Sequence, residues 1–414
     1  MKWNLLCLIF CLFSTLWCDT TYVEGDTELW GIMEAENSPY VISGQITVPK
    51  DETLTIEPGC ELRFTGFYKI KVDTNATLKA VGTVEDSIIF TRHYSAEESR
   101  WHGIRFRFSN ANSILSYCRI EYATGSLPGS DNTGGGILIW VSDITVEHCT
   151  IRYNTLAHAG AQGCGIYVFE SSPKINYNHI HHNVYPFNSG VSRGGGLYLT
   201  TSLLAEFKYN LIHHNSVNKT GGGIAMAWNS SPVLDHNTII ENYAGYRGGG
   251  ISVVFGANPF ITNSIIINNH CHDSAYADVS TNTPLAANYS IIGGYSESTV
   301  WDEDPLFVDP DMGNFQLQYW SPAIDKGDPD YEYDPDNSVT DIGATWYNHG
   351  IPLGTLGDIN SDSFIDIFDI VIIIDAFLGD IFQNGQEFWR SDINGDLALD
   401  ISDILLLIDM ILGI

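Results

Sequence analysis

The sequence predicts a mainly β fold, in which most of the chain forms a solenoid of short strands and a small all-α module follows. A strand-forming unit recurs at intervals of 26 to 32 residues, and a glycine-rich turn recurs in step with it. The composition then changes sharply near residue 357, where acidic residues become frequent. Repeats of this length with short strands are typical of stacked coils, each of which contacts only its neighbours.

The first recurring unit is a small or amide residue followed two positions later by isoleucine. It occurs six times: Cys118-Arg-Ile120, Cys149-Thr-Ile151, Asn178-His-Ile180, Asn210-Leu-Ile212, Asn237-Thr-Ile239 and Asn263-Ser-Ile265. Because alternate side chains of a strand point to the same side, we expect the isoleucines to stack inside the solenoid. We expect the asparagines to adopt the left-handed backbone conformation and to form an amide ladder, with Cys118 and Cys149 in the same place in the first two coils.

The second unit is a glycine-rich turn that leads into an apolar strand. It occurs at Gly134-Gly-Gly-Ile137, Gly163-Cys-Gly-Ile166, Gly194-Gly-Gly-Leu197, Gly221-Gly-Gly-Ile224 and Gly248-Gly-Gly-Ile251. Glycine permits a positive φ and a close approach of two backbones, so these turns are expected at a tight corner of each coil.

Residues 40–346 resemble the right-handed parallel β-helix proteins of the pectate-lyase-like superfamily. The closing motif of such secreted proteins is recognisable in Asp304-Pro-Leu-Phe-Val-Asp309, Phe315-Gln-Leu317, Ser321-Pro-Ala-Ile-Asp-Lys-Gly327 and Asp341-Ile-Gly-Ala344. The resemblance implies a right-handed parallel β-helix with a closing cap over residues 19–346. A fold of this kind constrains the reaction much less than it constrains the structure.

Two acid-rich segments of 12 residues lie 34 positions apart in the last part of the chain. Loop positions 1, 3, 5, 7, 9 and 12 are Asp358, Asn360, Asp362, Phe364, Asp366 and Asp369 in the first segment, and Asp392, Asn394, Asp396, Ala398, Asp400 and Asp403 in the second. Side-chain oxygens with this spacing, and a backbone carbonyl at position 7, are what Ca²⁺ coordination requires. The sequence therefore predicts two Ca²⁺ loops, with Phe364 and Ala398 supplying the carbonyls.

Each loop leads into an apolar segment that ends at Gly379 or Gly413, as a helix with a C-terminal glycine would. A loop followed by a single helix resembles a dockerin, here over residues 357–414 after a linker at 347–356. The resemblance implies a cohesin-like protein as partner.

Two departures from the dockerin pattern bear on the partner and on the second loop. Loop positions 10 and 11, which help to select the cohesin, are Ile367-Phe368 and Ile401-Ser402 instead of small hydroxyl residues. The partner is then an unusual cohesin, or the helices dock onto the β-helix itself. Position 6 is Ser363 and Leu397 instead of glycine, so the second site is expected to be weaker.

The N-terminal residues 1–18 are expected to be a signal peptide, because Lys2 precedes a short apolar stretch. Cys18 leaves a lipidated N-terminus open as an alternative. The protein is therefore expected to be secreted, extracellular or on a cell surface, with no integral membrane segment. Its net charge of −31 argues against nucleic acid as a partner. The later cysteines are too scattered for a disulfide framework and are expected to be small core residues: Cys60, Cys118, Cys149, Cys164 and Cys271.

No catalytic motif is recognisable on the β-helix, so the catalytic residues are unassigned. The candidate acids are Asp131, Asp143, Glu147, Glu170, Glu206, Asp235 and Glu241, and the candidate bases are Arg105, Arg107, Arg119, Arg152, Arg193 and Arg247. Histidines recur as His181-His182 and His213-His214, with His148, His179 and His236 nearby. They form either a ladder that binds a metal or transfers protons, or turn residues beside the asparagines.

Aromatic residues follow the glycine-rich turns at Tyr167, Phe169, Tyr198, Trp228 and Phe255. They form either a face that stacks on sugar rings or part of the core. The leading functional hypothesis is a carbohydrate-associated β-helix that a dockerin attaches to a complex or surface. The alternatives are a polysaccharide lyase or glycoside hydrolase acting on an acidic polysaccharide, and a structural surface protein or adhesin without catalysis.

Overall fold

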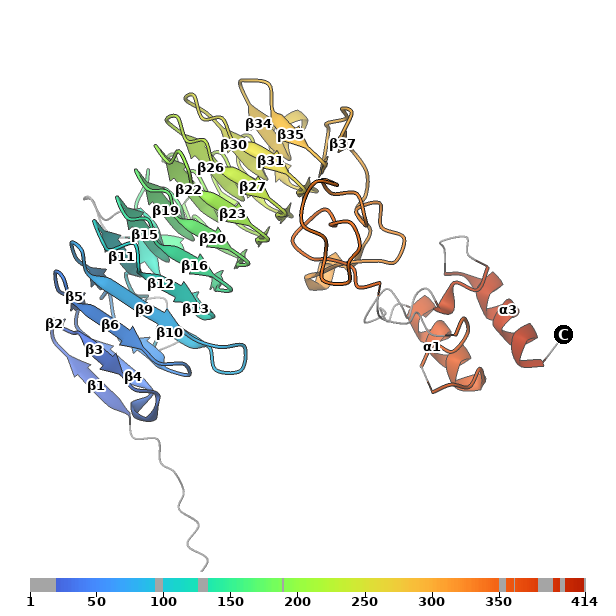
Figure 1. Cartoon of the computed structure of the whole chain (residues 1–414), viewed down its shortest axis with the longest axis horizontal. Helices are drawn as coiled ribbons and strands as arrows, with labels where there is room; N and C mark the ends of the chain where they lie inside the picture. Colours follow the sequence, from blue (N-terminus) through green and yellow to red (C-terminus); the bar gives the residue numbers. More distant parts are fainter. Residues whose placement is uncertain are drawn as a thin grey trace, which may run out of the picture.

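The computed structural model describes residues 20–93, 100–125, 133–187, 190–349, 355–360, 362–378, 390–394 and 399–412. The expected signal peptide, Asp131, Gly379, Asp396, Leu397, Ala398 and Gly413 lie outside the described residues, as do residues 350–354 of the expected linker. Figure 1 shows a curved stack of strands, then a compact segment without long strands, then two helices.

Three long sheets run along the stack, and neighbouring strands in each of them are parallel. Sheet A has 12 strands: β1 (Thr21–Glu24), β4 (Tyr40–Ser43), β7 (Glu61–Phe64), β10 (Ile88–Arg92), β13 (Cys118–Glu121), β17 (Thr150–Arg152), β21 (His179–His181), β24 (Leu211–His213), β28 (Thr238–Ile240), β32 (Ile265–Ile267), β36 (Ser290–Ile292) and β37 (Val300–Trp301). Sheet B has 10 strands: β2 (Thr27–Glu28), β5 (Ile46–Val48), β8 (Ile70–Val72), β11 (Ile104–Arg107), β15 (Ile137–Trp140), β19 (Ile166–Phe169), β22 (Leu197–Thr200), β26 (Ile224–Ala227), β30 (Ile251–Val253) and β34 (Val279–Thr281). Sheet C has 10 strands: β3 (Gly31–Met33), β6 (Thr53–Ile56), β9 (Thr77–Val81), β12 (Ile114–Ser116), β16 (Thr145–Glu147), β20 (Lys174–Asn176), β23 (Glu206–Lys208), β27 (Val233–Asp235), β31 (Phe260–Thr262) and β35 (Ala286–Asn288).

Shorter elements complete the coils. They are β14 (Thr124–Gly125) with β18 (Thr155–Leu156), β25 (Ser216–Val217) with β29 (Tyr243–Ala244) and β33 (His270–Cys271), the closing hairpin β38 (Phe307–Asp309) and β39 (Asn314–Leu317), and the 3-10 turns at Ala35–Asn37, Ser274–Tyr276 and Pro310–Met312. Each coil passes once through sheets A, B and C, and the solenoid is right-handed. The predicted fold class is therefore confirmed.

The interior is filled by columns of identical or similar side chains, one per coil. Parallel pairing aligns the isoleucines of sheet A into one column of fully buried residues: Ile120, Ile151, Ile180, Ile212, Ile239, Ile266 and Ile292. Sheets B and C contribute equivalent columns, so the apolar side chains of each coil rest on those of the next. The stacked isoleucines predicted from the repeat are confirmed from Ile120 to Ile239. The prediction for Ile265 is wrong, because Ile265 pairs with Thr238 and packs against the closing segment, and Ile266 takes its place in the column.

The predicted ladder runs along the turn that precedes sheet A. Each ladder side chain accepts the backbone N–H of its counterpart one coil earlier, as when Asn210 Oδ1 accepts from Asn178 N at 3.0 Å. The asparagine amide also donates inward, for example from Asn178 Nδ2 to the Val146 carbonyl at 2.9 Å. Cys149 Sγ occupies the same place against Cys118 N at 3.4 Å, as predicted.

Two details of that prediction are wrong. The residue before each ladder position, not the asparagine itself, has the left-handed backbone: Tyr117, His148, Tyr177, Tyr209, His236, Asn263 and Tyr289. Asn263 belongs to this left-handed column, because Thr238 pairs with Ile265 and thereby places Ser264 opposite Asn237. Ser264 Oγ accepts from Asn237 N at 3.0 Å and continues the ladder.

A second asparagine ladder follows sheet A and was not anticipated from the sequence. Its members are Asn154, Asn183, Asn215, Asn242 and Asn269, each accepting the N–H of the one before it, and Asp278 closes it. Their spacings of 29, 32, 27 and 27 match the main repeat, so the signal was present. Every strand of sheet A from β17 to β32 is thus held at both ends by side chains that satisfy turn N–H groups.

The glycine-rich turns have the expected role. The first glycine of every triplet has a positive φ, from 63° at Gly248 to 70° at Gly194. The second packs directly on the next coil, where a Cβ on Gly135 would lie 2.1 Å from the carbonyl oxygen of Cys164. Glycine holds this second position in four of the five turns, and Cys164 holds it in the turn at 163–165.

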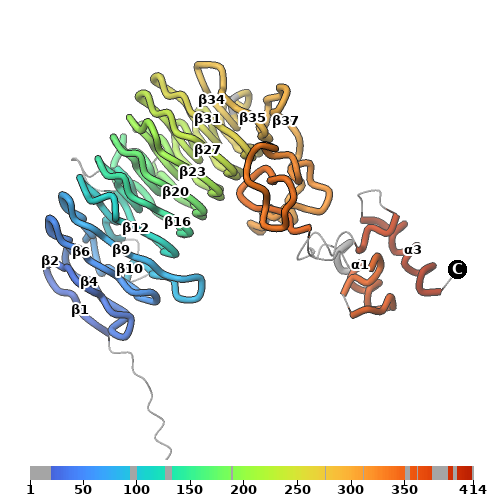
Figure 2. The backbone as a smooth tube through the Cα atoms, viewed as in Figure 1, coloured from blue at the N-terminus to red at the C-terminus, as the bar shows by residue number. Residues whose placement is uncertain are grey.

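The closing segment, residues 302–349, packs against the outer face of sheet A at its last coils. Its apolar residues cover Ile240, Ile265 and Ile291, and they include Phe307, Phe315, Leu317, Ala323 and Ile342. Hydrogen bonds from Asp328 N to Asn263 Oδ1 (2.7 Å) and from Ala344 N to Thr238 Oγ1 (2.9 Å) fix it in place. Figure 2 shows the segment as a compact loop structure beside the last strands.

The second ladder predicts a specific stability effect. Asn215→Ala would leave Asn183 N and the carbonyls of Ile180 and His213 without their buried partner. We expect the free energy of unfolding to fall by roughly 2–4 kcal/mol, because each unsatisfied buried group costs about 1–3 kcal/mol. Thermal and denaturant unfolding measure this change. The exposed Asn282→Ala is the matched control, and an equal effect of both substitutions would contradict the prediction.

Candidate functional site

The outer face of sheet A gathers charged and imidazole side chains in one row across successive coils. The register aligns Glu121, Arg152, His181 and His213. Glu121 is buried and accepts hydrogen bonds from Arg152 Nε at 2.8 Å and from Thr91 Oγ1 at 3.1 Å. The row therefore changes along the solenoid from an ion pair to imidazoles, and it ends where the closing segment begins.

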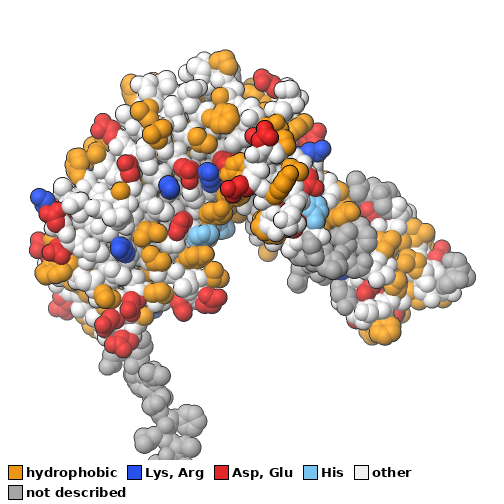
Figure 3. Space-filling model, in the orientation of Figure 1, with side chains coloured by type: hydrophobic (Ala, Val, Ile, Leu, Met, Phe, Trp, Pro, Cys, Tyr) orange, Lys and Arg blue, Asp and Glu red, His pale blue; other side chains and the backbone are white. Residues whose placement is uncertain are grey.

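Three histidines of two adjacent strands meet on this face. His179 and His181 both point outward from β21 because Ile180 between them points into the core. His213 lies on β24, with its ring parallel to that of His181 at a centroid distance of 5.0 Å. The Nε2 atoms of His179 and His213 are 2.5 Å apart, and one ring nitrogen of each of the three residues lies within 4.8 Å of the others. Figure 3 shows histidine side chains gathered on the hollowed side of the β-helix.

These imidazoles are neutral at ordinary pH. Burial, with a smaller contribution from neighbouring histidines, lowers the pKa of His179 to about 4 and the pKa values of His181 and His213 to about 2, and Arg152 adds to the effect at His179 and His181. A neutral imidazole has a lone pair available, which is what a metal ion or a proton donor requires.

The two members of each His-His pair occupy different positions: His181 and His213 lie on the outer face of sheet A, as the first interpretation requires, and its metal-binding or proton-transfer role stays a prediction. His182 and His214 are turn residues, with φ values of 53° and 52°. Their Nδ1 atoms lie 2.8 Å from Nδ1 of His181 and 2.7 Å from Nδ1 of His213, so the turn histidines contact the histidines of the outer face. The remaining candidates, His148 and His236, lie on the opposite edge of sheet A.

That opposite edge carries a continuous column of stacked rings, which are the left-handed residues before the first ladder. Tyr117, His148, Tyr177, Tyr209 and His236 stack at centroid distances of 4.7, 4.8, 4.8 and 4.5 Å. His236 is buried and contacts Asp235 Oδ1 and Thr340 Oγ1, both at 2.8 Å. It therefore joins the β-helix to the closing segment.

A pocket of about 510 Å³ opens between this column and the closing segment. It is lined by Tyr177, Tyr209, Gln316, Glu332, Tyr333, Asp334, Pro335, Ala344, Thr345 and Trp346. Four aromatic rings, two carboxylates and an amide offer both flat apolar surfaces and acceptors for hydroxyl groups. Sequence reasoning did not find this pocket, because only the packing of the closing segment brings residues 316–346 beside Tyr177 and Tyr209.

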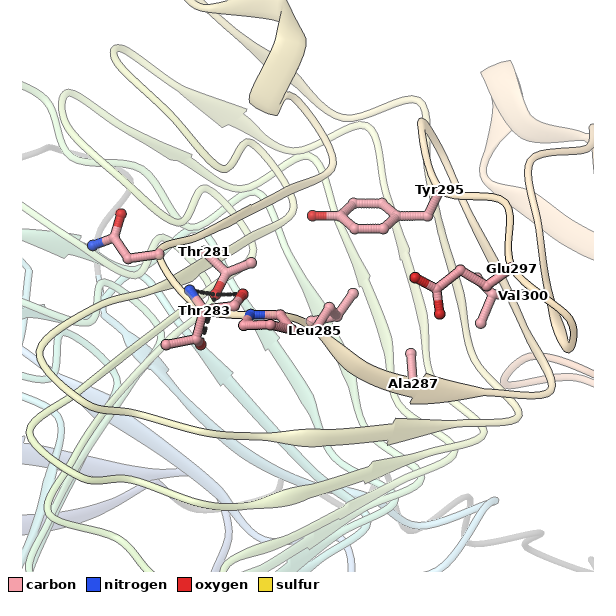
Figure 4. A pocket seen from close by; sticks show the side chains of 9 residues that line it. Thr281, Thr283, Leu285, Ala287, Tyr295, Glu297 and Val300 are labelled. Atoms are coloured by element: carbon pink, nitrogen blue, oxygen red, sulfur yellow. Dashed lines mark hydrogen bonds between the residues drawn. The ribbon is translucent and has the colours of Figure 1, made fainter.

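A second pocket, of about 380 Å³, lies at the end of the solenoid. In Figure 4, Tyr295 and Glu297 line one side of it, and Thr281, Thr283 and Leu285 line the other. Thr281 Oγ1 is already hydrogen-bonded to Thr283, and Leu285 packs on the core. Its lining offers less for recognition of a polar ligand than that of the first pocket.

The aromatic residues predicted from the glycine-rich turns do not form one face. Tyr167 and Tyr198 are buried and stack on each other at 5.4 Å beside sheet B. Phe169 packs on Trp140 at 4.0 Å. Trp228 and Phe255 form an exposed stacked pair at 4.7 Å, because they occupy turn positions with positive φ.

The candidate acids and bases are mostly engaged in structural contacts. Arg105 is fully buried, Arg107 lies over Trp140, Arg247 pairs with Asp273, Asp235 contacts His236, and Asp143 accepts from Ser172 N. Of the candidate bases, Arg119 and Arg152 lie on the outer face of sheet A, and both contact Glu121. This group is the part of the predicted acid–base set that the structure brings beside the histidines.

The two acidic loops have the same local geometry wherever both are described. Asp369 Oδ1 accepts from Ile359 N at 2.8 Å and its Oδ2 accepts from Asp366 N at 2.9 Å, and Asp403 makes the equivalent bonds to Ile393 N and Asp400 N. Asp369 and Asp403 are fully buried, and Asp358 and Asp392 are nearly so. Buried carboxylates that accept backbone N–H bonds, as those of Asp358, Asp369 and Asp403 do, suit a bound cation.

Residues at loop positions 6, 7 and 8 also lie as expected from the alignment of the two loops. Ser363, at loop position 6, has a φ of 73°. The Phe364 side chain is exposed, and Ile365 and Leu399 pack in the core shared by the two loops.

The helices α1 (Ile367–Leu378) and α3 (Ile401–Leu412) follow the loops and share a small core around Ile359, Ile373 and Leu407. This core includes no residue of the β-helix cores in the described part of the chain. At loop positions 10 and 11, which help to select the cohesin in dockerins, Ile367, Phe368 and Ile401 are 65%, 64% and 65% exposed. Among the described helices, none combines the length and the apolar character that a membrane crossing needs.

Comparison with known families agrees with both parts of the architecture. Residues 40–245 match the family model of the right handed beta helix region, and residues 356–412 match the dockerin type I domain. No curated protein and no solved structure matches the chain. The protein is a right-handed β-helix protein with a dockerin type I domain after the β-helix. Domains of this type bind calcium and cohesins, and proteins that contain them are typically extracellular.

One carboxyl group of the closing segment predicts a pH effect. Asp341 accepts from Asp325 N at 2.8 Å and from Tyr347 N at 2.5 Å, and burial raises its pKa to about 7 from its ordinary value of 3.8. Between these values the folded protein keeps a proton that the unfolded chain has released, so stability falls as the pH rises. We expect wild-type stability to fall relative to Asp341→Asn from pH 3.8 to about 7. Unfolding curves across this range measure the difference. The free energy of unfolding of the exposed-site variant Asp330→Asn should depend on pH as that of the wild type does. The same pH dependence in the wild type and in Asp341→Asn would disprove the prediction.

Proposed function

We propose that this protein is a secreted carbohydrate-binding β-helix that its dockerin attaches to a cohesin-bearing complex or surface. One observation carries the proposal: the chain that contains a dockerin also has a pocket lined by Tyr177, Tyr209, Tyr333 and Trp346 together with Glu332 and Asp334. Sugar rings stack on aromatic faces through their C–H groups, and their hydroxyls donate to carboxylates.

The size and charge of the pocket support a neutral sugar as ligand. Its volume of about 510 Å³ lies within the range of roughly 300–1,000 Å³ that is usual for small-molecule sites. Glu332 and Asp334 would repel the carboxylates of a uronic acid, whereas they accept hydrogen bonds from neutral hydroxyls. A neutral polysaccharide, or the neutral end of one, is therefore the ligand class that the pocket favours.

The attachment would depend on calcium. The ligand oxygens would come from Asp358, Asn360, Asp362, Phe364, Asp366 and Asp369, and from Asp392, Asn394, Asp396, Ala398, Asp400 and Asp403. The buried position of four of these carboxylates supports the assignment, because an ionised carboxylate away from water is costly unless a positive charge compensates it. The exposed Ile367, Phe368 and Ile401 offer an apolar docking face for the cohesin.

Catalysis on a polysaccharide is the second candidate function. It is favoured by the row of Glu121, Arg152 and His181 on the outer face of sheet A, since a carboxylate and a neutral imidazole can accept protons and the guanidinium between them can stabilise negative charge. New reducing ends, or the ultraviolet absorbance of unsaturated sugars, in an incubation with polysaccharides would identify a hydrolase or a lyase.

The carbohydrate proposal predicts that the aromatic lining of the pocket is required for binding. Trp346→Ala and Tyr333→Ala should weaken binding to a polysaccharide selected from a glycan array by about tenfold or more, because each stacked ring contributes about 0.5–1.5 kcal/mol beyond its buried area. Affinity electrophoresis or calorimetry of the full chain measures the loss. Trp228→Ala, in the exposed pair away from the pocket, is the control. No binding by the wild type, or a loss caused only by Trp228→Ala, would refute the proposal.

The calcium proposal predicts that chelation unfolds residues 357–412 and leaves the β-helix folded. Metal binding and folding are coupled in small metal-binding domains, whereas the solenoid has its own core. Circular dichroism should show loss of helix but not of strand. Asp403→Asn should weaken Ca²⁺ binding by about tenfold or more, and the exposed Asp409→Asn should not. An unchanged circular dichroism spectrum and an unchanged melting profile in excess EDTA would contradict this prediction.

A further inference from the structure

We propose that His179, His181 and His213 form a binding site for a transition-metal ion such as Zn²⁺, separate from the calcium loops. Imidazole nitrogen is a preferred ligand of Zn²⁺, Cu²⁺ and Ni²⁺, whereas Ca²⁺ takes oxygen ligands. The one ring nitrogen that each residue offers lies within 4.8 Å of the other two. The proposal does not depend on carbohydrate binding.

The fold holds the three side chains in place before any ion binds. Ile180 and Ile212 anchor β21 and β24 in the interior column, and both strands are fixed at each end by an asparagine ladder. The pairing of His181 with His213 across the two strands places their rings parallel at 5.0 Å. Rigid strands of this kind position ligands more accurately than loops do.

The contacts of the ring nitrogens direct the free atoms toward a common point. Nδ1 of His181 and Nδ1 of His213 are each within hydrogen-bond distance of the following histidine, at 2.8 and 2.7 Å, which leaves Nε2 for an ion. A partner of this type orients a metal-binding imidazole and fixes its tautomer. Nε2 of His179 already faces Nε2 of His213 at 2.5 Å.

Small ring rotations complete the geometry. Zn–N bonds of about 2.0–2.1 Å in a tetrahedron place ligand nitrogens about 3.3 Å apart. The present spacings, from 2.5 Å to within 4.8 Å, lie on both sides of this value. Rotation about the terminal side-chain bonds, whose torsions are broad, would turn the parallel rings of His181 and His213 so that their lone pairs converge on one ion.

The electrostatic surroundings permit a cation. The three imidazoles are neutral, and the cation that acts on His179 and His181, Arg152, is paired with the buried Glu121 at 2.8 Å. Phe315 of the closing segment lies 4.9 Å from the His213 ring and covers one side. Three protein ligands leave a fourth position for water or a ligand oxygen, as in open zinc sites.

The site also lies beside the pocket. Phe315 contacts His213, and the next residue on β39, Gln316, lines the pocket of about 510 Å³. A ligand in the pocket and an ion on the histidines would therefore lie on the two faces of one short strand.

The test uses the full chain in excess Ca²⁺, with Zn²⁺ or Co²⁺ added alone. Calorimetry should show one Zn²⁺ bound at this site, and Co²⁺ should produce the visible absorption bands of a low-symmetry nitrogen-ligated ion. His179→Ala should weaken binding by about tenfold or more. His179 is half-buried, so its variant is the least disruptive of the three, and His213→Ala should abolish the bands.

The matched control is the double variant His270→Ala with His272→Ala, which removes the exposed histidines beside Cys271. It should bind Zn²⁺ and Co²⁺ like the wild type. Absence of Zn²⁺ binding, unchanged binding in His179→Ala, or loss in the control variant would each overturn the proposal. Trp346→Ala should leave metal binding intact, so failure of the carbohydrate proposal and failure of the metal proposal are distinguishable.

Discussion

The hydrogen bond that a backbone N–H donates to an asparagine side-chain oxygen of the next coil is the interaction on which the rest of the structure depends. Parallel sheets satisfy their own backbone groups, but the turns between them do not, and a buried N–H without a partner is costly. The two ladders beside sheet A supply that partner in coil after coil. They also fix the register, so that outward side chains such as Glu121, Arg152 and His181 line up in a row.

The fold could be predicted from the sequence because successive coils carry the same residue types at the same positions. Isoleucine every 26 to 32 residues predicted the interior column, and twelve spaced ligand positions predicted two equivalent loops. The error at Asn263 arose because asparagine serves both a left-handed turn position and a ladder position, which lie one residue apart. Only the strand pairing, with Ile265 opposite Thr238, distinguishes the two.

The candidate sites were less predictable because they depend on contacts between distant segments. The histidine pairs were visible in the sequence, but the alternation of β21 was needed to separate His181 from His182 and to add His179. The pocket required the closing segment to fold back onto Tyr177 and Tyr209 from more than 100 residues away. No local pattern encodes such a return, whereas the dockerin loops are encoded within 12 consecutive residues each.

The closing segment makes the two ends of the outer face of sheet A different. Among the described residues, Phe315, Leu317 and Ile342 of the closing segment pack on this face from β24 onward. The fold itself therefore sets a boundary on the face. A linear molecule lying along the stacking axis would pass Glu121 and Arg152 and would then meet the closing segment after the histidine row.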